Sequence, residues 1–370
     1  MTDGRLGVAL PSSARWTVLE PLLDGALARS ANERVAYLDE ACGADLVLRA
    51  EVDRMLAAWD RIQLDTTYLE QPAAVRFASL WDERVDEARF QRAIAERFRL
   101  DGELGRGGMA IVYRAHDRRD AHVVALKVVR TTTSAGGAVR FRREIALAAR
   151  LRHPHILPLL ESGECDDRLW YTMPLVVGES LGDRLHRDGR LPIGETVRIL
   201  REICEGLACA HAEGVVHRDL KPDNVLLADG HAVIADFGVA KALVSATHGD
   251  RMMGDDIRTA TGAGVGTPAY MSPEQAAGER SVDHRADLYA LGVIAYELLT
   301  GKPPFTATSR QALITAHLAE RPVSPSTHRR EIPRTLDALV LRLLAKQAKD
   351  RPASAAEVIT LLAGLTFVRQ

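Results

Sequence analysis

The sequence predicts an α+β fold with two lobes, a small β-rich lobe followed by a larger α-helical lobe, and a small helical extension in front of them. The first observation is a series of short, β-type apolar runs between residues 97 and 129, interrupted by glycine or polar clusters. Such runs are typical of antiparallel strands. The second observation is that apolar residues recur at helical spacing over most of the chain beyond Pro192.

The composition is that of a globular protein. The 370 residues are 46% hydrophobic and 26% charged, which is enough for a large core and two to three domains. The 48 Lys and Arg nearly balance the 50 Asp and Glu, so the overall charge favours neither nucleic acid nor an anionic membrane, and no nucleic-acid partner is predicted. The four cysteines form no CxxC pair, and we expect free thiols in a reducing cytosol.

The N-terminus lacks the basic stretch and apolar core of a secretory signal. The most apolar run, residues 288–299, contains Glu297 and is shorter than the roughly 18 apolar residues that span a bilayer. We therefore expect a cytoplasmic protein, with a membrane tether only if the natural chain extends beyond Gln370.

Residues 1–62 are predicted to form the helical extension, because apolar residues recur at helical spacing over residues 16–27 and 48–59. Between these segments Asn32 can cap a short helix that ends at Cys42. Core packing or docking explains such apolar stripes better than a ligand site does. We interpret the extension as a regulatory or docking module.

Residues 63–96 are predicted to form a linker around Pro72 and a charged helix, and residues 97–365 form the main domain. Its β-rich lobe begins with the runs RFRLDGEL, IVYRAH and HVVALKVV, and a helix follows over residues 139–151. The clearest helices of the second lobe are expected over residues 197–211, 286–299 and 336–345.

The string LGRGGMAIVY, which begins at Leu104, places Gly105, Gly107 and Gly108 in a strand–turn–strand unit. Glycines there let the backbone close over phosphate groups and offer amide donors to their oxygens. A glycine-rich hairpin without a ligand explains the string equally well. No GK[ST] follows and the next element is a strand, so this is not a Walker loop.

Lys127 lies within the apolar strand VALKVV, where a lysine avoids burial unless it has a charged partner. Glu144, in the helical string FRREIALAARL, can supply that partner. An ordinary surface ion pair is the alternative. Together with the glycine loop, the pair resembles a lysine that holds nucleotide phosphates and a helical glutamate that positions it.

The string HRDLKPDN carries the most specific chemistry. Phosphoryl transfer needs a carboxylate that orients the attacking hydroxyl and accepts its proton, with a metal ligand nearby, and Asp219 and Asn224 suit these roles. Lys221 can neutralise the transferred phosphate. Asp236 in ADFGVAK follows an apolar strand, and with Asn224 it predicts a Mg²⁺ site completed by nucleotide phosphates. A structural ion pair is the alternative for Asp236.

With these strings in place, residues 97–365 resemble the eukaryotic-type (Hanks-type) serine/threonine protein kinases, particularly their bacterial branch. The resemblance implies the bilobal protein kinase fold and transfer of the γ-phosphoryl group of ATP to serine or threonine of proteins, with Mg²⁺ or Mn²⁺, in bacterial signalling. Lysine within HRDLKPDN followed by GTPAY resembles serine/threonine rather than tyrosine kinases, and dual specificity stays open.

The resemblance also implies a nucleotide site in which Met173 is the gatekeeper behind adenine. Pro174 and Val176 form the hinge. Proline at the first hinge position removes only an amide donor and keeps the carbonyl that adenine needs. Ala110 replaces the third glycine of the phosphate loop. The implied ATP-binding residues are Leu104, Gly105, Gly107, Gly108, Val112, Ala125, Lys127, Glu144, Met173, Pro174 and Val176.

The string GTPAYMSPEQ resembles the substrate-docking segment of the family. There the resemblance implies that Thr267 contacts Asp219 and Lys221, and that Glu274 pairs with Arg351. It also implies that Asp287 anchors the catalytic loop.

Thr259 and Thr261 lie where the bacterial branch carries activating phosphothreonines, and Arg218 can pair with such a phosphate. We expect autophosphorylation at one or both, although a merely solvated polar loop is the alternative.

Two other functions stay open at this point. A pseudokinase would bind nucleotide without transferring phosphate, and an adaptor would act through the N-terminal extension. The enzyme is favoured because Lys127, Glu144, Asp219, Asn224 and Asp236 are all present. The expected partners are protein substrates with serine or threonine, and a homodimer is possible.

Overall fold

The structure is a computed structural model. It describes residues 21–22, 25–26, 29, 31–43, 45, 48–49, 52–53, 87–107, 110–129, 135–166, 168–237, 268–279 and 281–365. The chain divides into two compact units, residues 1–91 and residues 92–370, which we describe separately.

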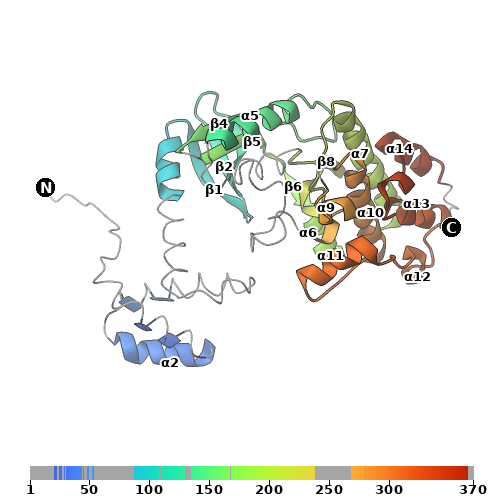
Figure 1. Cartoon of the computed structure of the whole chain (residues 1–370). Coiled ribbons are helices and arrows are strands. Elements are labelled where there is room, and N and C mark those ends of the chain that lie inside the picture. Colours follow the sequence, from blue (N-terminus) through green and yellow to red (C-terminus); the bar gives the residue numbers. More distant parts are fainter. Residues whose placement is uncertain are drawn as a thin grey trace. The chain divides into compact units, whose positions relative to one another are not determined.

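The first unit contains α2 (Ala31–Cys42), which ends where the sequence predicts, with Gly43 in the left-handed region at φ 52° (Figure 1). Asn32 lies inside this helix, so its predicted role as the cap at the start of the helix is wrong: the backbone is already helical at Ala31. The apolar residues Ala26, Leu38, Leu48 and Val52 are buried. Most of residues 16–27 and 48–59, where helical periodicity was predicted, lie outside the described residues.

The second unit begins with a five-stranded antiparallel sheet in the order β1-β2-β3-β5-β4. The three strands predicted from the sequence are present, and β4 and β5 were missed. Glu161–Cys165 is short and polar, whereas β5 carries the strand-forming residues Leu169, Trp170 and Tyr171 and was overlooked. The bounds are β1 (Phe98–Arg106), β2 (Ala110–Asp117), β3 (Val123–Val129), β4 (Glu161–Cys165) and β5 (Arg168–Pro174).

Helix α5 (Ala135–Ala148) follows β3, as expected for the helix predicted over residues 139–151. Its Phe141 and Ile145 are fully buried and cluster with Val129, Leu169 and Tyr171 from the sheet. The helix therefore packs on the Val129–Leu169 end of the sheet face that carries the odd-numbered residues of β3 and β5.

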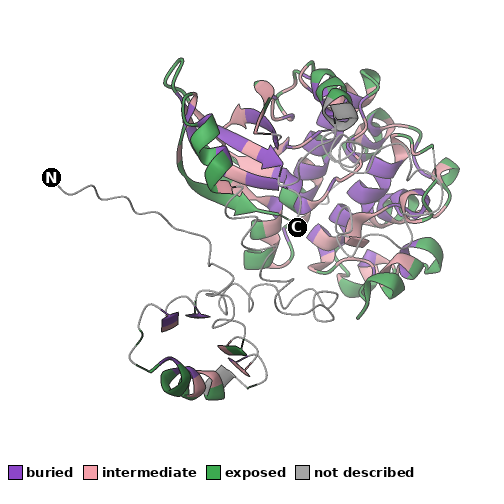
Figure 2. Cartoon of the chain, turned by 60° about the vertical axis from the view of Figure 1, so that its left-hand side comes forward, coloured by how far each residue is buried: buried purple, intermediate pink, exposed green. Residues whose placement is uncertain are grey.

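The second lobe is helical, and its core is built around α7 and α10 (Figures 1 and 2). Nearly every side chain of α10 is buried, which explains why its sequence is apolar around the whole helix. The predicted helices are confirmed within a few residues at each end. The bounds are α6 (Leu181–Asp188), α7 (Ile193–Ala212), α9 (Pro273–Ala276), α10 (Arg285–Thr300), α11 (Arg310–Ala319), α12 (Pro325–His328), α13 (Arg334–Leu343) and α14 (Ala355–Ala363), with the short 3₁₀ turns Pro222–Asn224, Pro268–Tyr270 and Ala348–Asp350.

A small sheet of β6 (Gly178–Ser180), β7 (Val225–Ala228) and β8 (His231–Ile234) lies at the junction of the lobes. Residues 155–157, which connect α5 to β4, are joined to β8. Leu157 N donates to Ile234 O at 2.8 Å and Ile234 N donates to His155 O at 3.0 Å. A Cβ at Gly206 on α7 would lie 2.9 Å from His155 O, so this connection packs directly against α7 of the helical lobe.

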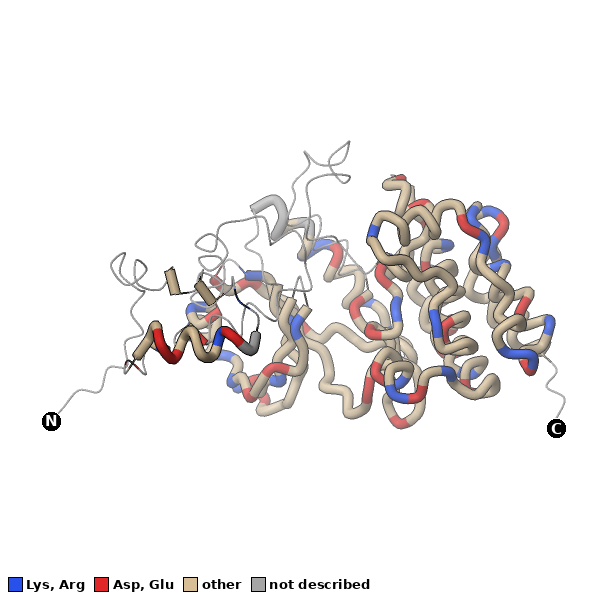
Figure 3. The backbone as a smooth tube through the Cα atoms, turned by 90° about the horizontal axis from the view of Figure 1, so that it is seen from below, with Lys and Arg blue, Asp and Glu red and all other residues tan. Residues whose placement is uncertain are grey.

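Lys and Arg alternate with Asp and Glu along the described tube of the second unit, in keeping with the balanced charge (Figure 3). Among the helices that the structure describes, none has the length and apolar character needed to cross a bilayer. All four cysteines are free, as predicted.

Candidate active site

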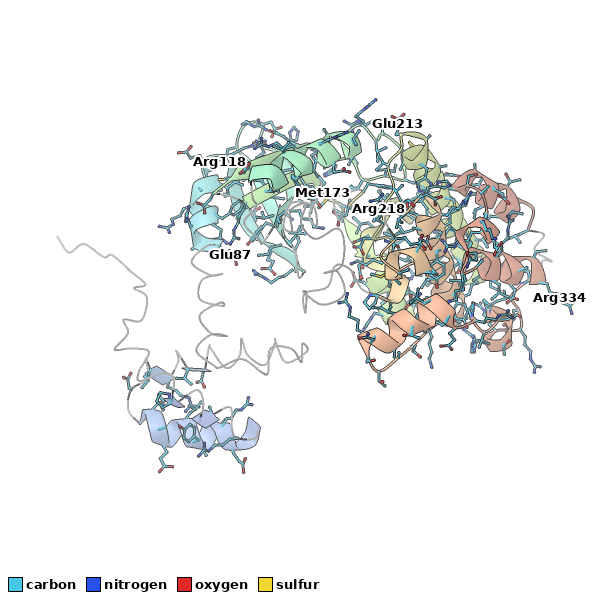
Figure 4. The ribbon with its side chains drawn as sticks, in the orientation of Figure 1. Glu87, Arg118, Met173, Glu213, Arg218 and Arg334 are labelled. Carbon is cyan, nitrogen blue, oxygen red and sulfur yellow. The ribbon has the colours of Figure 1, made fainter. Side chains whose placement is uncertain are left out.

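Strand register places five side chains on one face of the large sheet. Val112 pairs with Lys127, Lys127 with Tyr171, and Ala125 with Met173. Residues directly opposite on antiparallel strands share a face, as do residues two apart on one strand. The predicted nucleotide residues Val112, Ala125, Lys127 and Met173 therefore line a single surface. Met173 lies on the sheet and Arg218 on the helical lobe that faces it (Figure 4).

The described residues of the glycine loop lie where β1 ends and β2 begins. Leu104 lies at the irregularity between Glu103 and Gly105 in the β1–β2 pairing and is about half exposed. Gly107 N donates to Ala110 O at 2.9 Å, and a Cβ at Gly105 would meet open space. Gly108 lies outside the described residues.

Beyond Met173 the chain leaves the sheet at Pro174, the last residue of β5, and continues through Val176 to β6. Val176 is half-buried in this connection. The predicted hinge residues thus lie between the sheet and the helical lobe, as the resemblance implies.

Asp287 at the start of α10 holds the loop that carries HRDLKPDN. The carboxylate is fully buried and accepts the backbone N–H groups of His217 and Arg218, each at 2.8 Å, and a bond from His211 Nε2 at 2.8 Å. Burial alone would raise the pKa of Asp287, but the bond from His211 and nearby histidine charge lower it below its ordinary value. Arg218 has φ 67°, a strained conformation that this anchor supports.

The three predicted catalytic side chains converge within this loop. Lys221 Nζ lies 3.3 Å from Asp219 Oδ2. Asn224 Nδ2 donates to the carbonyl of Asp219 at 2.7 Å and lies 3.3 Å from its Oδ2. The Asn224 amide nitrogen is thereby engaged with Asp219, and its amide oxygen is the acceptor that it can offer to a cation.

Asp236 is fixed through its backbone neighbour and through both carboxylate oxygens. Ala235 N donates to Asn224 O at 2.8 Å, and Ala235 O accepts a bond from His217 Nε2 at 2.8 Å. Lys127 Nζ lies 2.6 Å from Asp236 Oδ2, and the Tyr171 hydroxyl donates to Oδ1 at 2.7 Å. Burial favours a raised pKa, but the Lys127 charge and these two bonds hold the pKa of Asp236 below its ordinary value.

The structure records Lys127 in an ion pair with Asp236, a partner that was not predicted from the sequence. The Lys127 ammonium pairs with Asp236, whereas Glu144 lies half-buried on α5. A buried carboxylate needs a compensating cation, and the register of β3 aims Lys127 at Asp236. The prediction that Lys127 needs an acidic partner is confirmed by Asp236, and its pairing with Glu144 stays a prediction.

Asn224 and Asp236 are the residues that could hold a divalent cation. One carboxylate and one amide oxygen are hard donors of the kind that Mg²⁺ prefers when substrate phosphates complete its shell. Among the described residues no group of three or more His, Cys, Asp or Glu side chains could hold a metal by itself. The donor set therefore fits a cation that is shared with a phosphate.

The segment that begins at Pro268 is anchored by Glu274. Arg351 is buried and makes a two-pronged pair with Glu274, with both N···O distances 2.7 Å, as the resemblance implies. Ser272 caps α9 through Gln275, whose side-chain amide donates to Arg218 O at 2.8 Å and ties the segment to the catalytic loop. Thr259, Thr261 and Thr267 lie outside the described residues.

Two participants were missed from the sequence. Tyr171 is 2% exposed and bonds Asp236, and His211 bonds Asp287. A tyrosine hydroxyl in a strand that is otherwise buried must find a partner, and this was the available signal for Tyr171. His211 ends a long amphipathic helix and gave no comparable signal.

The sequence matches the family model described as "Protein kinase domain" over residues 98–360. The chain is 40% identical over 274 residues to "Serine/threonine-protein kinase pkn3" of Myxococcus xanthus, covering 71% of this chain and 49% of that protein. It is 38% identical over 272 residues to "Serine/threonine-protein kinase PknB" of Mycobacterium leprae, covering 72% and 42%. The matches thus span about half or less of the length of these curated relatives. Among solved structures, the PknI kinase domain of Mycobacterium tuberculosis superposes with a TM-score of 0.56 at 30% identity, covering 72% of this chain and 94% of that chain.

Proposed function

Because the chain belongs to the protein kinase family, we propose that it transfers the γ-phosphoryl group of ATP to serine or threonine hydroxyls of proteins in bacterial signalling. Members of the family have the bilobal protein kinase fold and use ATP with a divalent cation. The observation that carries the proposal is the joint placement of Asp219, Lys221 and Asn224 on one loop that a buried carboxylate anchors.

In the proposed reaction Asp219 accepts a hydrogen bond from the substrate hydroxyl and takes its proton as the new O–P bond forms. The bond between the γ-phosphorus and the bridging oxygen breaks, and ADP leaves. Lys221 lies beside Asp219, so its ammonium can neutralise charge on the phosphoryl oxygens during transfer.

Nucleotide would bind against the sheet face formed by Val112, Ala125, Lys127 and Met173, under the glycine loop. Asn224 and Asp236 would hold Mg²⁺ or Mn²⁺, which supplies positive charge to the phosphate oxygens. Lys127 neutralises Asp236 in this structure, and we propose that it also contacts phosphate when nucleotide is bound.

The proposed function is tested by measuring whether the chain transfers phosphate to a protein. Purified chain incubated with ATP and Mg²⁺ should phosphorylate itself or a basic model substrate on serine or threonine, as read by mass spectrometry. Asp219→Asn should bind ATP normally and transfer roughly 10² to 10⁴ times more slowly. A well-folded Asp219→Asn protein with wild-type turnover would remove Asp219 from the role. A wild-type chain that binds nucleotide and transfers nothing would support the binding module instead.

We also propose that Thr259 and Thr261 are autophosphorylated. A phosphate there carries about -1.5 to -2 charges and can pair with Arg218, whose own loop adjoins the substrate segment. A Thr259→Ala, Thr261→Ala double variant should show lower activity than wild type after preincubation with ATP. Full activity in a double variant shown to be free of phosphate on this segment would contradict the switch.

The cellular location, the role of the N-terminal extension and the partners are likewise proposed. A cytoplasmic location is supported by the need for ATP and by four free thiols. Residues 1–62 are proposed as a regulatory or docking module. Protein substrates with serine or threonine are the partners, and a homodimer and a membrane tether are arrangements that the proposal allows.

A further inference from the structure

We propose that Tyr171 is a positioning residue for Asp236: its hydroxyl sets the orientation of the carboxylate that is to receive the divalent cation. The proposal rests on the proposed function, since it concerns the metal–nucleotide site of that function. It goes beyond the residues that the sequence strings identified, because Tyr171 belongs to none of them.

The register of the sheet makes Tyr171 and Lys127 a cross-strand pair. They are Cα partners on β5 and β3, so their side chains leave the same face side by side. Both reach Asp236, which is far away in sequence. The tyrosine hydroxyl meets Oδ1 at 2.7 Å and the lysine ammonium meets Oδ2 at 2.6 Å. Two neighbouring donors on a rigid sheet therefore hold the two oxygens of one carboxylate.

The two hydrogen bonds from Tyr171 and Lys127 fix the rotation of the Asp236 side chain, which the backbone does not determine. The backbone at Asp236 is set by the two Ala235 hydrogen bonds and a φ of 64°, but neither fixes rotation of the side chain. Lys127 alone grips one oxygen through a long, flexible stem. Tyr171 is only 2% exposed and is packed in the cluster with Phe141 and Ile145, so its hydroxyl is a stationary donor.

A neutral donor suits this role. The hydroxyl orients Oδ1 and leaves the carboxylate its full negative charge for a cation, whereas a second ammonium would compete with the cation for that charge. Hydrogen-bond partners of metal ligands act in this way elsewhere, and removing them commonly weakens metal binding by about 10- to 100-fold.

The competing explanation is that Tyr171 merely finds a partner for a buried hydroxyl. A structural bond of that kind contributes to stability and has no particular effect on metal affinity. Tyr289 provides the matched control, because its buried hydroxyl bonds His317 Nδ1 at 2.9 Å within the helical lobe. Tyr289→Phe deletes the same group from another buried hydrogen bond.

The experiment titrates Mn²⁺ into the 370-residue chain saturated with ADP, and free Mn²⁺ is read from its electron paramagnetic resonance signal. Tyr171→Phe should weaken Mn²⁺ binding by about 10- to 100-fold. Affinity for ADP in the absence of metal, measured by calorimetry, should change by less than about threefold, because the adenine and hinge contacts are untouched. Tyr289→Phe should leave Mn²⁺ binding within about threefold of wild type, whatever it does to the melting temperature.

Two tyrosine analogues keep the test decisive if loss of the hydroxyl unfolds the protein. Para-methylphenylalanine at position 171 keeps the shape and lacks a donor, whereas para-aminophenylalanine restores an N–H donor. Only the amino analogue should return Mn²⁺ affinity toward that of wild type.

Equal Mn²⁺ affinity in wild type and Tyr171→Phe, or in the two analogues, overturns the inference while leaving the proposed function intact. Wild-type protein that binds no Mn²⁺ with ADP and transfers no phosphate overturns both. Equal losses in Tyr171→Phe and Tyr289→Phe show that the effect is only structural, and this too overturns the inference.

Discussion

The anchor at Asp287 offers a sharp test of how the catalytic loop is held. Asp287→Asn keeps the shape of the side chain and exchanges one acceptor oxygen for an NH₂ donor. In the structure three donors converge on the carboxylate: the backbone N–H groups of His217 and Arg218 and the ring of His211. An asparagine offers a single acceptor oxygen, so it cannot accept both backbone N–H groups in the same geometry.

The loss of stability in Asp287→Asn follows from the number of hydrogen-bond donors that lose their acceptor. His211 can change tautomer and accept from the new NH₂ group, but one of the two backbone N–H groups loses its acceptor whichever way the amide turns. A buried orphaned donor costs about 1–3 kcal/mol, and the remaining bond loses its charged acceptor. We expect Asp287→Asn to lower the free energy of unfolding by about 2–4 kcal/mol. Turnover should fall by about 10²-fold, because a displacement near 1 Å of Asp219 is enough for such a loss.

Urea unfolding followed by circular dichroism gives the first quantity, and phosphate transfer at saturating ATP gives the second. Asp283→Asn is the matched control, since it removes the same charge from an exposed position just before α10 and should change stability by less than about 0.5 kcal/mol. If Asp287→Asn is as stable and as active as Asp283→Asn, the reasoning about the anchor is refuted.

Two further predictions concern buried charge in the helical lobe. Arg351→Met should destabilise the protein by about 3–5 kcal/mol, because it leaves the Glu274 carboxylate buried without its partner, and adding Glu274→Gln should recover part of the loss in urea unfolding. No recovery in the double variant would contradict this account. His317 is 1% exposed, and burial, followed by the nearby Lys346 charge, lowers its pKa to about 4. The unfolded chain then binds the proton more readily, so stability should fall by about 2 kcal/mol between about pH 7 and about pH 5. His317→Gln should flatten this dependence, and parallel curves for the two proteins would contradict it.

The sequence predicted the part of the site whose reactive side chains are close together in the chain. Asp219, Lys221 and Asn224 lie within one short loop, so their convergence needs only that loop to fold. The fold class was predictable for a similar reason, since the period of the apolar residues changes where the sheet gives way to helices.

Contacts set by tertiary register were not predictable in this way. The sequence offered Glu144 as the partner of Lys127, whereas the observed pair with Asp236 depends on tertiary packing rather than on any local pattern. The bond from Tyr171 to Asp236 required the pairing of β3 with β5, which the sequence did not reveal. At Asn32 a favourable capping residue was overridden, because the helix already includes Ala31.

The connection between α5 and β4 is bonded to the helical lobe at residues 155–157. Residues 155–157 belong to the first lobe by sequence, but their backbone is bonded to Ile234 and seated against Gly206, so they are stationary with respect to the helical lobe. If α5 tilted, residues 155–157 would stay in place and the helix would rotate about them. Ile234, which bonds this connection, lies two residues before Asp236. The end of the connection and the Asp236 carboxylate are therefore held by the same part of the helical lobe. Glu144 lies on α5 and Asp236 lies two residues beyond Ile234, so a tilt of α5 would change the separation of these two carboxylates.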